Sequence, residues 1–478
     1  QVDVSTYKDP WEYGGDTGLK NLTAFVKKLN NMSQSSIRGM DISSYTALKK
    51  AGVKYYDFDG KETSLLKVLH DNGVNYIRIR IWNDPTNEKG ETYGGGANDV
   101  ATGLEIAKEA AQYDMKLLLD FHYSDFWADP ALQKIPKAWE KDKNDTEKMK
   151  QNVYDFTKDT IKKFQEVGAD IGMVQNGMLD IMPDYSKGET YKDTWGNAKN
   201  AKILCGYLKA GIKAVRECTP KALVTLHLES MGYGKCSEIM NAWEQNGVDY
   251  DVFGSSFYQF WQGNSSKNAL AGLQKIENLA KSRGKMYAVM ETSWLNSLKD
   301  ADGTPNVIGE GHANAKVYSD DPQGQVDALT DMYQILLSND NGLGAFYWEG
   351  AWIPVKAGWT NWKYNKDMSD RYGTGWAAQG AKGYYPDNKM YYNGQPAWGG
   401  SSWDNQTLFD SNGYPLQSLK FYKDSVSKGK EQIIALKIVD KNGKEVYATQ
   451  YVKVEVGKSR TITLPKFSGY YPSNKKYQ

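Results

Sequence analysis

The chain contains the mainly apolar run Asn75-Tyr-Ile-Arg-Ile-Arg80, and a second run, Lys116-Leu-Leu-Leu-Asp120, follows after a longer segment of helical character. Short apolar runs without strict polar alternation are typical of parallel strands that are buried on both faces. Six further runs of this kind lie at residues 39–42, 170–174, 222–226, 251–254, 286–290 and 344–348. The sequence therefore predicts eight parallel strands.

Helical spacing of apolar residues separates these runs. It occurs at residues 64–71, 98–113, 145–167, 196–217, 237–245, 268–283 and 321–339. Eight alternations of strand and helix favour an α/β fold of the (β/α)8 TIM barrel type. A doubly wound sheet is the alternative, but no glycine-rich phosphate-binding fingerprint opens any of these helices.

The composition changes along the chain and predicts three parts. Residues 1–35 are polar and are interpreted as an N-terminal extension, and residues 36–427 form the barrel. The Gly-, Trp- and Tyr-rich segment 350–415 is expected to be an ordered excursion at the top of the barrel. Residues 428–478 form a small all-β appendage, with strands at 433–438, 445–456 and 460–464 and a hairpin signal at Asn442-Gly443.

Charge and composition exclude several classes of protein. The 478 residues hold 59 Lys and Arg against 58 Asp and Glu, so no basic field favours nucleic acid. No apolar run is long enough to span a bilayer, and Gln1-Val2-Asp3 opens no signal peptide. Three cysteines make neither a disulfide framework nor a zinc site. The 15 Trp and 33 Tyr suit either core packing or stacking platforms for sugar rings.

The residues at the end of each predicted strand are the candidate site, because TIM barrels build their active sites there. They are Asp41, Arg80, Trp82, Asp120, His122, Gln175, Asn176, His227, Glu229, Tyr258, Glu291 and Trp348. Carboxylates surrounded by cationic and aromatic groups suit glycosidic bond cleavage, which uses two carboxyl groups. Glu291 is the strongest candidate; a surface ion pair is its alternative. Arg80 also fits an interior salt bridge, and His122 and His227 also fit core positions.

Several longer motifs resemble glycoside hydrolase family 53. They are Arg38-Gly-Met-Asp-Ile-Ser-Ser44, Asp71-Asn-Gly-Val-Asn-Tyr-Ile-Arg-Ile-Arg-Ile-Trp-Asn-Asp-Pro85, Asp120-Phe-His-Tyr-Ser-Asp-Phe-Trp-Ala-Asp-Pro130, Phe257-Tyr-Gln-Phe-Trp261, Glu291-Thr-Ser293, Tyr347-Trp-Glu-Gly-Ala-Trp-Ile-Pro354 and Trp403-Asp-Asn-Gln-Thr-Leu-Phe409. The resemblance runs in order over residues 36–425. It implies a retaining endo-β-1,4-galactanase that cuts the β-1,4-galactan side chains of pectin, type I (arabino)galactan.

The resemblance also implies roles for individual residues. Glu291 would be the nucleophile, Arg80 would keep it ionised, and Tyr258 would hydrogen-bond it. Taken from the strand-end positions and from the resemblance together, the predicted substrate-binding residues are Asp41, Arg80, Trp82, His122, Trp127, His227, Tyr258, Trp261, Trp348 and Trp352. Within that set, His122 and Trp348 would line the sugar site next to the cleaved bond. The tryptophans Trp82, Trp127, Trp261 and Trp352 would be stacking platforms.

A structural calcium ion is implied in the loop after the seventh strand. The segment Asp300-Ala-Asp302-Gly-Thr304-Pro-Asn306 resembles the calcium loop of the family. Its alternating oxygen-bearing side chains can surround one hard cation. An ordinary Asp/Gly/Pro turn is the alternative, and the family usually has a histidine where Thr304 stands.

The sequence departs from the family pattern after the fourth strand. There the family has Val-Gln-(apolar)-Gly-Asn-Glu-Thr, and its Glu is the acid/base; here Gln175 runs directly into Asn176-Gly-Met. The acid/base, expected next to Gln175 and Asn176, is not identifiable. In one interpretation the active enzyme carries a segment that this sequence lacks. In a second, the protein binds galactan without cutting it. In a third, Asp180 or Asp184 serves as a displaced acid, or Glu229 after the fifth strand helps.

Other function classes remain open at this point. The C-terminal strands suit a carbohydrate- or cell-surface-binding module, and a sister activity on mannan or glucan is the enzymatic alternative. The expected partners are β-1,4-galactan and galacto-oligosaccharides, with neither nucleic acid nor a membrane span. A monomer is expected. Secretion or display at the cell surface follows from the polymeric substrate.

Overall fold

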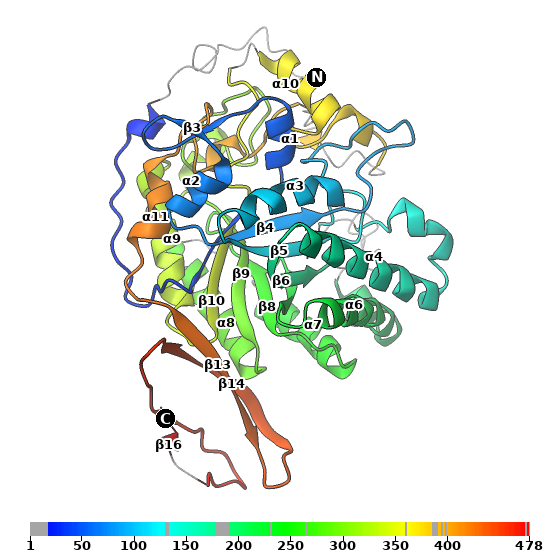
Figure 1. Cartoon of the computed structure of the whole chain (residues 1–478), viewed down its shortest axis with the longest axis vertical. Helices are drawn as coiled ribbons and strands as arrows, with labels where there is room; N and C mark the ends of the chain where they lie inside the picture. The colour runs from blue at the N-terminus through cyan, green and yellow to red at the C-terminus, as the bar shows by residue number, and fades with distance from the viewer. Residues whose placement is uncertain are drawn as a thin grey trace.

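The computed structural model describes residues 18–129, 133–177, 191–229, 232–262, 265–358, 361–384, 391–392, 395–396, 399–473 and 476–477. Eight parallel strands close into a barrel in the order β1-β10-β9-β8-β7-β6-β5-β4 (Figure 1). They are β1 (Ile37–Asp41), β4 (Tyr76–Ile81), β5 (Lys116–Phe121), β6 (Asp170–Asn176), β7 (Leu223–Leu228), β8 (Val252–Ser256), β9 (Met286–Thr292) and β10 (Gly342–Tyr347). The predicted TIM barrel is confirmed.

Helices connect and surround these strands. The main ones are α2 (Leu65–Asp71), α3 (Val100–Ala111), α4 (Thr146–Glu166), α6 (Ala198–Cys218), α7 (Tyr233–Gln245), α8 (Ser266–Ser282) and α9 (Pro322–Leu336). Asp99 and Asp145 accept hydrogen bonds from the first-turn backbone amides of α3 and α4. These side chains satisfy amide groups that have no partner inside the helix, which fixes where each helix begins.

Strand β4 shows how the barrel sorts its side chains. Ile77, Ile79 and Ile81 belong to the large core cluster between the strands and the surrounding helices. Arg78 and Arg80, on the opposite face, are 2% and 1% exposed. Because successive side chains of a strand alternate between its faces, both arginines lie inside the barrel. The barrel interior therefore contains charged side chains near the end where the strands finish.

The described residues between 350 and 415 pass over the end of the barrel where the strands finish. They include α10 (Trp362–Tyr372) and the short helix η8 (Asp404–Gln406). The Tyr347 hydroxyl contacts the carbonyl oxygens of Trp294 and Gln406, at 2.9 Å and 2.5 Å. These contacts fasten the excursion to the ends of β9 and β10.

The segment before β1 runs beside the segment that leaves the barrel. The amide of Leu29 donates to Ser425 O at 2.8 Å, and the amide of Ser427 donates to Met32 O at 2.9 Å. Ser33 and Lys428 form an isolated parallel bridge. Residues 29–33 are therefore joined to residues 425–428, the segment between the barrel and the C-terminal strands, just before β1 begins.

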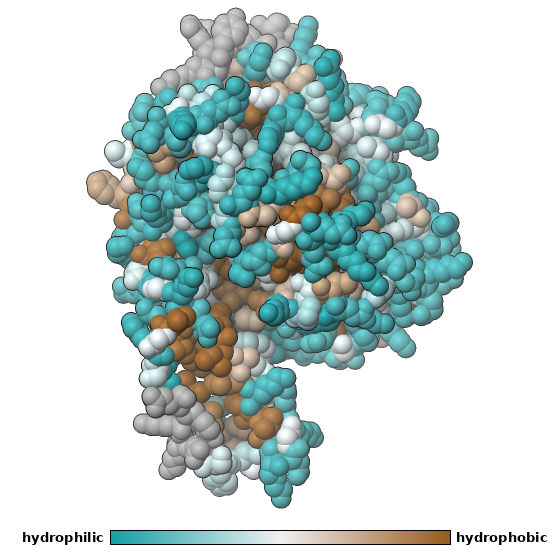
Figure 2. All heavy atoms as spheres, in the orientation of Figure 1, coloured by the Kyte–Doolittle hydropathy of each residue, from teal (hydrophilic) through white to brown (hydrophobic). Residues whose placement is uncertain are grey.

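Strands β13 (Glu431–Val439) and β14 (Glu445–Glu455) form an antiparallel ribbon (Figure 1). The ribbon projects from the end of the barrel where the strands begin, opposite the excursion. The Tyr451 hydroxyl donates to Gly284 O at 2.9 Å, just before β9 begins. The predicted turn at Asn442-Gly443 lies between the strands, with Gly443 at φ 81°. Figure 2 shows apolar residues gathered along the ribbon and where it meets the barrel, whereas most of this face is hydrophilic.

Among the residues that the structure describes, no helix has the length and apolar character that a bilayer crossing requires.

Candidate active site

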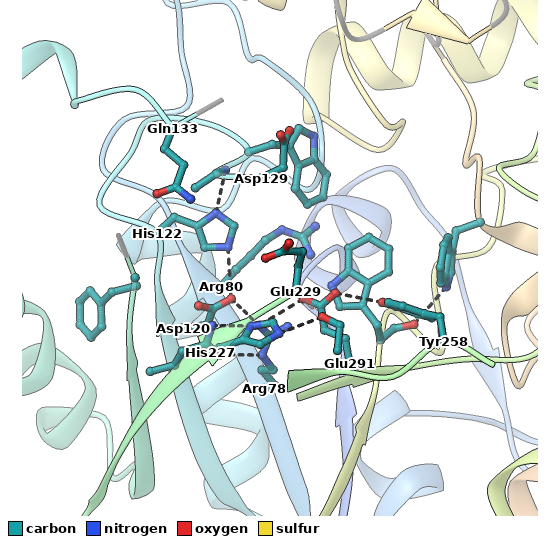
Figure 3. Close-up of a pocket in the computed structure, with 18 of the residues that line it drawn as sticks. Arg78, Arg80, Asp120, His122, Asp129, Gln133, His227, Glu229, Tyr258 and Glu291 are labelled. Atoms are coloured by element: carbon teal, nitrogen blue, oxygen red, sulfur yellow. Dashed lines mark hydrogen bonds and ion pairs between the residues drawn. The ribbon is translucent and has the colours of Figure 1, made fainter. Parts of the chain in front are cut away.

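A cavity of about 550 Å³ opens at the C-terminal ends of the barrel strands (Figure 3). Its lining includes Arg78, Arg80, Asp120, His122, Trp127, Asp129, Gln133, Gln175, Gly177, His227, Glu229, Lys235, Tyr258, Trp261, Glu291, Trp348, Trp376 and Trp403. These residues come from or just after seven of the eight barrel strands and from the long excursion. The site thus lies at the predicted end of the barrel.

Glu291, near the end of β9, occupies the floor of this cavity. The Tyr258 hydroxyl donates a hydrogen bond of 2.9 Å to its Oε1 atom. Arg78 Nη2 lies 3.5 Å from its Oε2 atom, and the Glu291 side chain is 22% exposed. The carboxylate is therefore fixed by two partners and still faces the cavity.

The pKa of Glu291 is raised from its ordinary value. Burial is the largest cause, and the negative charges of Asp120 and Asp41 add to it. The cation of Arg78 and the hydrogen bond from Tyr258 act in the opposite direction and favour the ionised form. The ionisation of Glu291 thus depends on the charges around it.

The arginine that contacts Glu291 is Arg78, and the predicted assignment to Arg80 is wrong. Arg78 also pairs with Asp41 at 3.0 Å and with Asp120 at 2.9 Å. Arg80 pairs with Glu349 at 2.6 Å. Both arginines point into the barrel from β4, one layer apart, so the sequence pattern alone cannot tell which one reaches the β9 carboxylate.

Gln175 and His227 form a hydrogen-bonded layer around Arg78. Gln175 Oε1 accepts from Arg78 Nη2 at 3.0 Å, so its amide nitrogen donates to His227 Nδ1, also at 3.0 Å. Burial, followed by repulsion from Arg78, lowers the pKa of His227 to about 3. His227 is therefore neutral, and its Nε2–H donates to Ser256 Oγ at 2.9 Å. It lines the cavity without being an acid.

His122 lines the cavity too, but both of its ring nitrogens have protein partners. Its Nδ1 accepts from Trp82 Nε1 at 3.0 Å and from the amide of Ala128 at 3.2 Å. Nε2, which then carries the proton, lies 3.2 Å from Asp120 Oδ2. The ring is oriented by the protein, so its exposed edge, rather than a free N–H group, faces the cavity.

The aromatic wall differs from the predicted one. Trp127, Trp261 and Trp348 line the cavity as expected, and Trp261 is 52% exposed. Trp82 and Trp352 are fully buried, so neither can stack on a sugar, and their prediction as platforms is wrong.

Two tryptophans of the excursion take part in this wall instead. Trp376 stacks on Trp352 with ring centroids 5.4 Å apart and planes 6° apart. Trp403 packs edge-on to Trp348 at 4.8 Å and donates from Nε1 to Trp348 O at 3.1 Å. The family-like motif that begins at Trp403 was a signal for that residue, whereas Trp376 had none beyond the local aromatic content.

Asp41 was predicted to bind substrate, but its side chain is fully buried and does not line the cavity. Its Oδ1 atom accepts from the amide and hydroxyl of Ser43, at 3.0 Å and 2.7 Å. Its Oδ2 atom faces Arg78. Asp41 therefore supports the arginine that contacts Glu291, and the prediction of direct binding is wrong.

Strand β6 ends at Asn176, at the point where the family pattern breaks. Asn176 is buried, and its Nδ2 donates to the Tyr123 hydroxyl at 2.9 Å, away from the cavity. Gly177 lines the cavity. The alternative acids Asp180 and Asp184 lie outside the described residues.

Two further carboxylates line the cavity without contacting Arg78 in the described part of the chain. Glu229 is the first residue after β7, forms an ion pair with Lys235 and is 39% exposed. Asp129 lies on the loop after β5. Figure 3 shows both in the same cavity as Glu291. The cavity therefore contains other carboxyl groups besides that of Glu291.

A separate cluster of three acidic side chains has the donor set of a calcium site. Carboxylate oxygens of Asp300, Asp302 and Asp404 all lie within 4.8 Å of one another. Burial, and then their mutual repulsion, raises the pKa values of Asp302 and Asp404; the pKa of Asp300 rises to about 7, with burial as its cause. Carboxylates this close repel one another, and a bound cation would favour their ionised form.

The neighbouring residues Thr304 and Asn306 fit the predicted loop. Both are buried, and the Oδ1 atoms of Asn306 and Asp404 have no hydrogen-bond partner within the described structure. Unpartnered buried oxygens are what a hard cation satisfies. The residues present therefore fit calcium. Asp404, from the excursion, was missed because it lies about a hundred residues away from the loop in sequence.

Comparisons with known proteins agree with this geometry. The model of glycosyl hydrolase family 53 matches residues 37–422. Endo-beta-1,4-galactanase of Bacillus subtilis (strain 168) is 40% identical over 401 residues, which is 84% of this chain and 88% of that protein. Arabinogalactan endo-beta-1,4-galactanase of Thermothelomyces thermophilus is 30% identical over 326 residues, which is 66% of this chain and 90% of that protein.

A solved structure supports the same assignment. The Ignisphaera aggregans GH53 catalytic domain aligns with a TM-score of 0.69 and 31% identity, covering 84% of this chain and all of that domain. The family match over residues 37–422 includes all eight barrel strands, among them the two that carry Arg78 and Glu291. On the family match over most of the chain and on this shared barrel, the protein belongs to glycosyl hydrolase family 53.

Proposed function

We propose that this chain hydrolyses internal β-1,4-galactosidic bonds of type I (arabino)galactan with retention of anomeric configuration. The observation that carries the proposal is the position of Glu291 at the end of β9, between Arg78 and Tyr258, on the floor of a tryptophan-walled cavity. The named galactanases among its relatives support the choice of galactan. The comparisons give no support to a protein that binds galactan without cleaving it.

In the proposed reaction Glu291 is the nucleophile. Its carboxylate oxygen attacks the anomeric carbon, the glycosidic bond breaks, and a covalent galactosyl-enzyme forms. Water then attacks the same carbon, gives its proton to the acid/base that lost one in the first step, and releases Glu291. Arg78 and Tyr258 keep the carboxylate ionised and aimed at the cavity between these steps.

The leaving oxygen needs a proton, and we assign its donor to Glu229. Although burial raises the pKa of Asp120, the charge of Arg78 and the hydrogen bond from His122 hold that pKa below its usual range, which excludes Asp120 as an acid. Glu229 directly follows β7, which pairs with β6. The family pattern places the acid/base after β6, so Glu229 lies one strand away from that position. Asp129 is eight residues beyond the end of β5 and is the less direct candidate. Glu229 must leave Lys235 in order to carry the proton.

We further propose that calcium occupies the cluster of Asp300, Asp302 and Asp404, with Thr304 and Asn306 beside it. Its charge would stabilise the fold of the loop after β9 and its contact with the excursion. The ion has no part in bond cleavage in this proposal. We also propose that the enzyme acts as a monomer. We place it outside the cell or at the cell surface, because its polymeric substrate cannot enter a cell intact.

The first experiment measures reducing-sugar release from linear β-1,4-galactan by protein whose intact mass equals the 53.7 kDa of this sequence. NMR of the first products should show the β-anomer before mutarotation, as retention requires. Galactan that stays intact would contradict the proposal, and the α-anomer as the first product would contradict retention. Mannan and glucan are the matched control substrates.

A further inference from the structure

A line of buried charges of alternating sign connects Glu349 with Glu291. Arg80 Nη1 lies 2.6 Å from Glu349 Oε1 and 3.8 Å from Asp41 Oδ1. Asp41 Oδ2 lies 3.0 Å from Arg78 Nη1, and Arg78 Nη2 lies 3.5 Å from Glu291. Figure 3 shows the two arginines and Glu291 of this line at the floor of the cavity. Neighbouring members of this line therefore share partners. Asp41 lies between the two arginines, and Arg78 lies between Asp41 and Glu291.

Glu349 itself is placed for support and not for contact with substrate. It follows Trp348 just beyond β10, is fully buried, and does not line the cavity. Besides Arg80, it accepts from the amide of Ser44 at 3.0 Å and from the Ser44 hydroxyl at 2.5 Å. Its backbone has φ 47°, a left-handed conformation that is unfavourable for a residue other than glycine. Such strain persists only where surrounding contacts hold it.

The middle of the line is equally constrained. Arg80 Nη2 donates to Gly95 O at 2.6 Å, and its guanidinium lies 4.5 Å from the ring centre of Trp127. Asp41 is the carboxylate that the two arginines share. If Glu349 did not hold Arg80, the guanidinium would draw on Asp41 more strongly, and Asp41 would neutralise less of the charge of Arg78.

We propose that Glu349 is a positioning residue whose negative charge, acting through Arg80, Asp41 and Arg78, sets how firmly the nucleophile Glu291 is held. The inference rests on the proposed role of Glu291. When Glu349 is ionised, Arg80 is neutralised by it and Asp41 is left to Arg78. The pull of Arg78 on Glu291 then weakens, and the carboxylate becomes a stronger nucleophile.

The charged and titratable neighbours of both ends support this direction. Glu291 is faced by Arg78 of β4, Asp120 of β5, Asp41 of β1 and Tyr258 after β8. Glu349 is faced by Arg80 and Asp41, and its charge also acts on Tyr55 of the short strand β2 (Tyr55–Tyr56). Burial, and the charge of Asp41 against the opposing effect of Arg80, raise the pKa of Glu349 to about 7. Its charge therefore changes near neutral pH.

The test measures the rate at which Glu291 forms a covalent bond with a trapping reagent. A 2,4-dinitrophenyl 2-deoxy-2-fluoro-β-galactoside forms a bond between its anomeric carbon and a Glu291 oxygen, and the bond to the departing dinitrophenolate breaks. This leaving group needs no proton, so the trapping rate is independent of the acid/base. The rate is measured from pH 4 to 9 for wild type, Glu349→Gln and Glu277→Gln. Glu277 is a buried carboxyl of α8 outside this line of charges and serves as the matched control.

The wild type and the control should show two rises in trapping rate, one for ionisation of Glu291 and one near pH 7. Glu349→Gln should lose the second rise and stay at the lower rate above pH 7. Ser44→Ala keeps Glu349 but removes a donor to its ionised form, so the second rise should move to higher pH. This milder variant serves if Glu349→Gln does not fold.

Two results would overturn the inference: a single rise in wild type, or a second rise that persists in Glu349→Gln. If the wild-type protein gains no adduct on Glu291 by mass spectrometry, the proposed nucleophile fails instead. The two failures are thus distinguishable.

Discussion

The hydroxyl of Tyr258 donates a 2.9 Å hydrogen bond to Oε1 of Glu291, on the opposite side of the carboxylate from Arg78. A hydrogen bond to the charged form of a carboxyl lowers its pKa. Because burial acts in the opposite direction at Glu291, the bond from Tyr258 contributes to keeping the nucleophile ionised.

The variant Tyr258→Phe should therefore move the acidic limb of the kcat/KM profile to higher pH. A hydrogen bond to a charged group contributes about 1.5–3 kcal/mol, which corresponds to roughly a 10- to 100-fold loss of kcat/KM. The measurement is the pH dependence of galactan hydrolysis. An unshifted limb with a uniformly lower rate would show that Tyr258 only shapes the cavity.

Glu229→Gln should reduce hydrolysis of galactan much more than hydrolysis of an aryl galactoside with an activated leaving group. General acid help contributes about 10²–10⁴-fold where the leaving group is poor. Asp129→Asn is the matched control and should leave the ratio of the two rates unchanged. If Asp129→Asn alone changes this ratio, the donor has been assigned to the wrong carboxylate.

Removal of calcium should destabilise the protein, and more so at high pH. The pKa values of Asp300, Asp302 and Asp404 in the folded, cation-free protein are raised, so its stability is greatest when they are protonated and falls as pH rises through about 7. Calcium at 100 times its Kd contributes about 2.7 kcal/mol.

The corresponding measurement is the melting temperature with calcium and with a chelator. The difference should be larger at pH 8 than at pH 5. Asp404→Asn should respond less to added calcium, and Mg²⁺ should replace calcium poorly because it demands a tighter octahedral shell. Equal melting temperatures with and without the chelator at pH 8 would rule out the site.

Trp376→Ala should raise KM for galactan with a smaller change in kcat. Trp376 lines the cavity and stacks on Trp352, so its loss removes a face on which a sugar ring can rest. A loss of 1–2 kcal/mol corresponds to about a 5- to 30-fold rise in KM. Tyr364→Ala, an exposed aromatic change on α10 of the same excursion, should leave KM unchanged.

The barrel was predictable because strand and helix periodicities alternate along the sequence without interruption. The position of Glu291 was predictable as well, because the strand that ends at it reads clearly and barrel sites lie at strand ends. The choice between Arg78 and Arg80 was not predictable. Both alternate onto the same face of β4, and only the stagger of neighbouring strands decides which one meets Glu291.

The errors in the aromatic wall have a related cause. Trp82 directly follows a strand, as a platform would, but it turns into the cluster around Phe126 and Tyr93. Trp376 and Asp404 reach their sites from an excursion whose path over the barrel has no periodic sequence signal. Contacts between residues that are far apart in sequence were the part that pattern reasoning could not supply.

The ribbon of β13 and β14 meets the barrel at Gly284 and Asn339, where β9 and β10 begin, whereas the cavity opens where these strands finish. An object attached through the ribbon would consequently leave the catalytic mouth facing outward. Immobilisation on a bead through this end should preserve access for long polymers, whereas attachment through α10 should obstruct it. Because the ribbon and the cavity lie at opposite ends of the barrel, attachment at one end leaves the other end exposed.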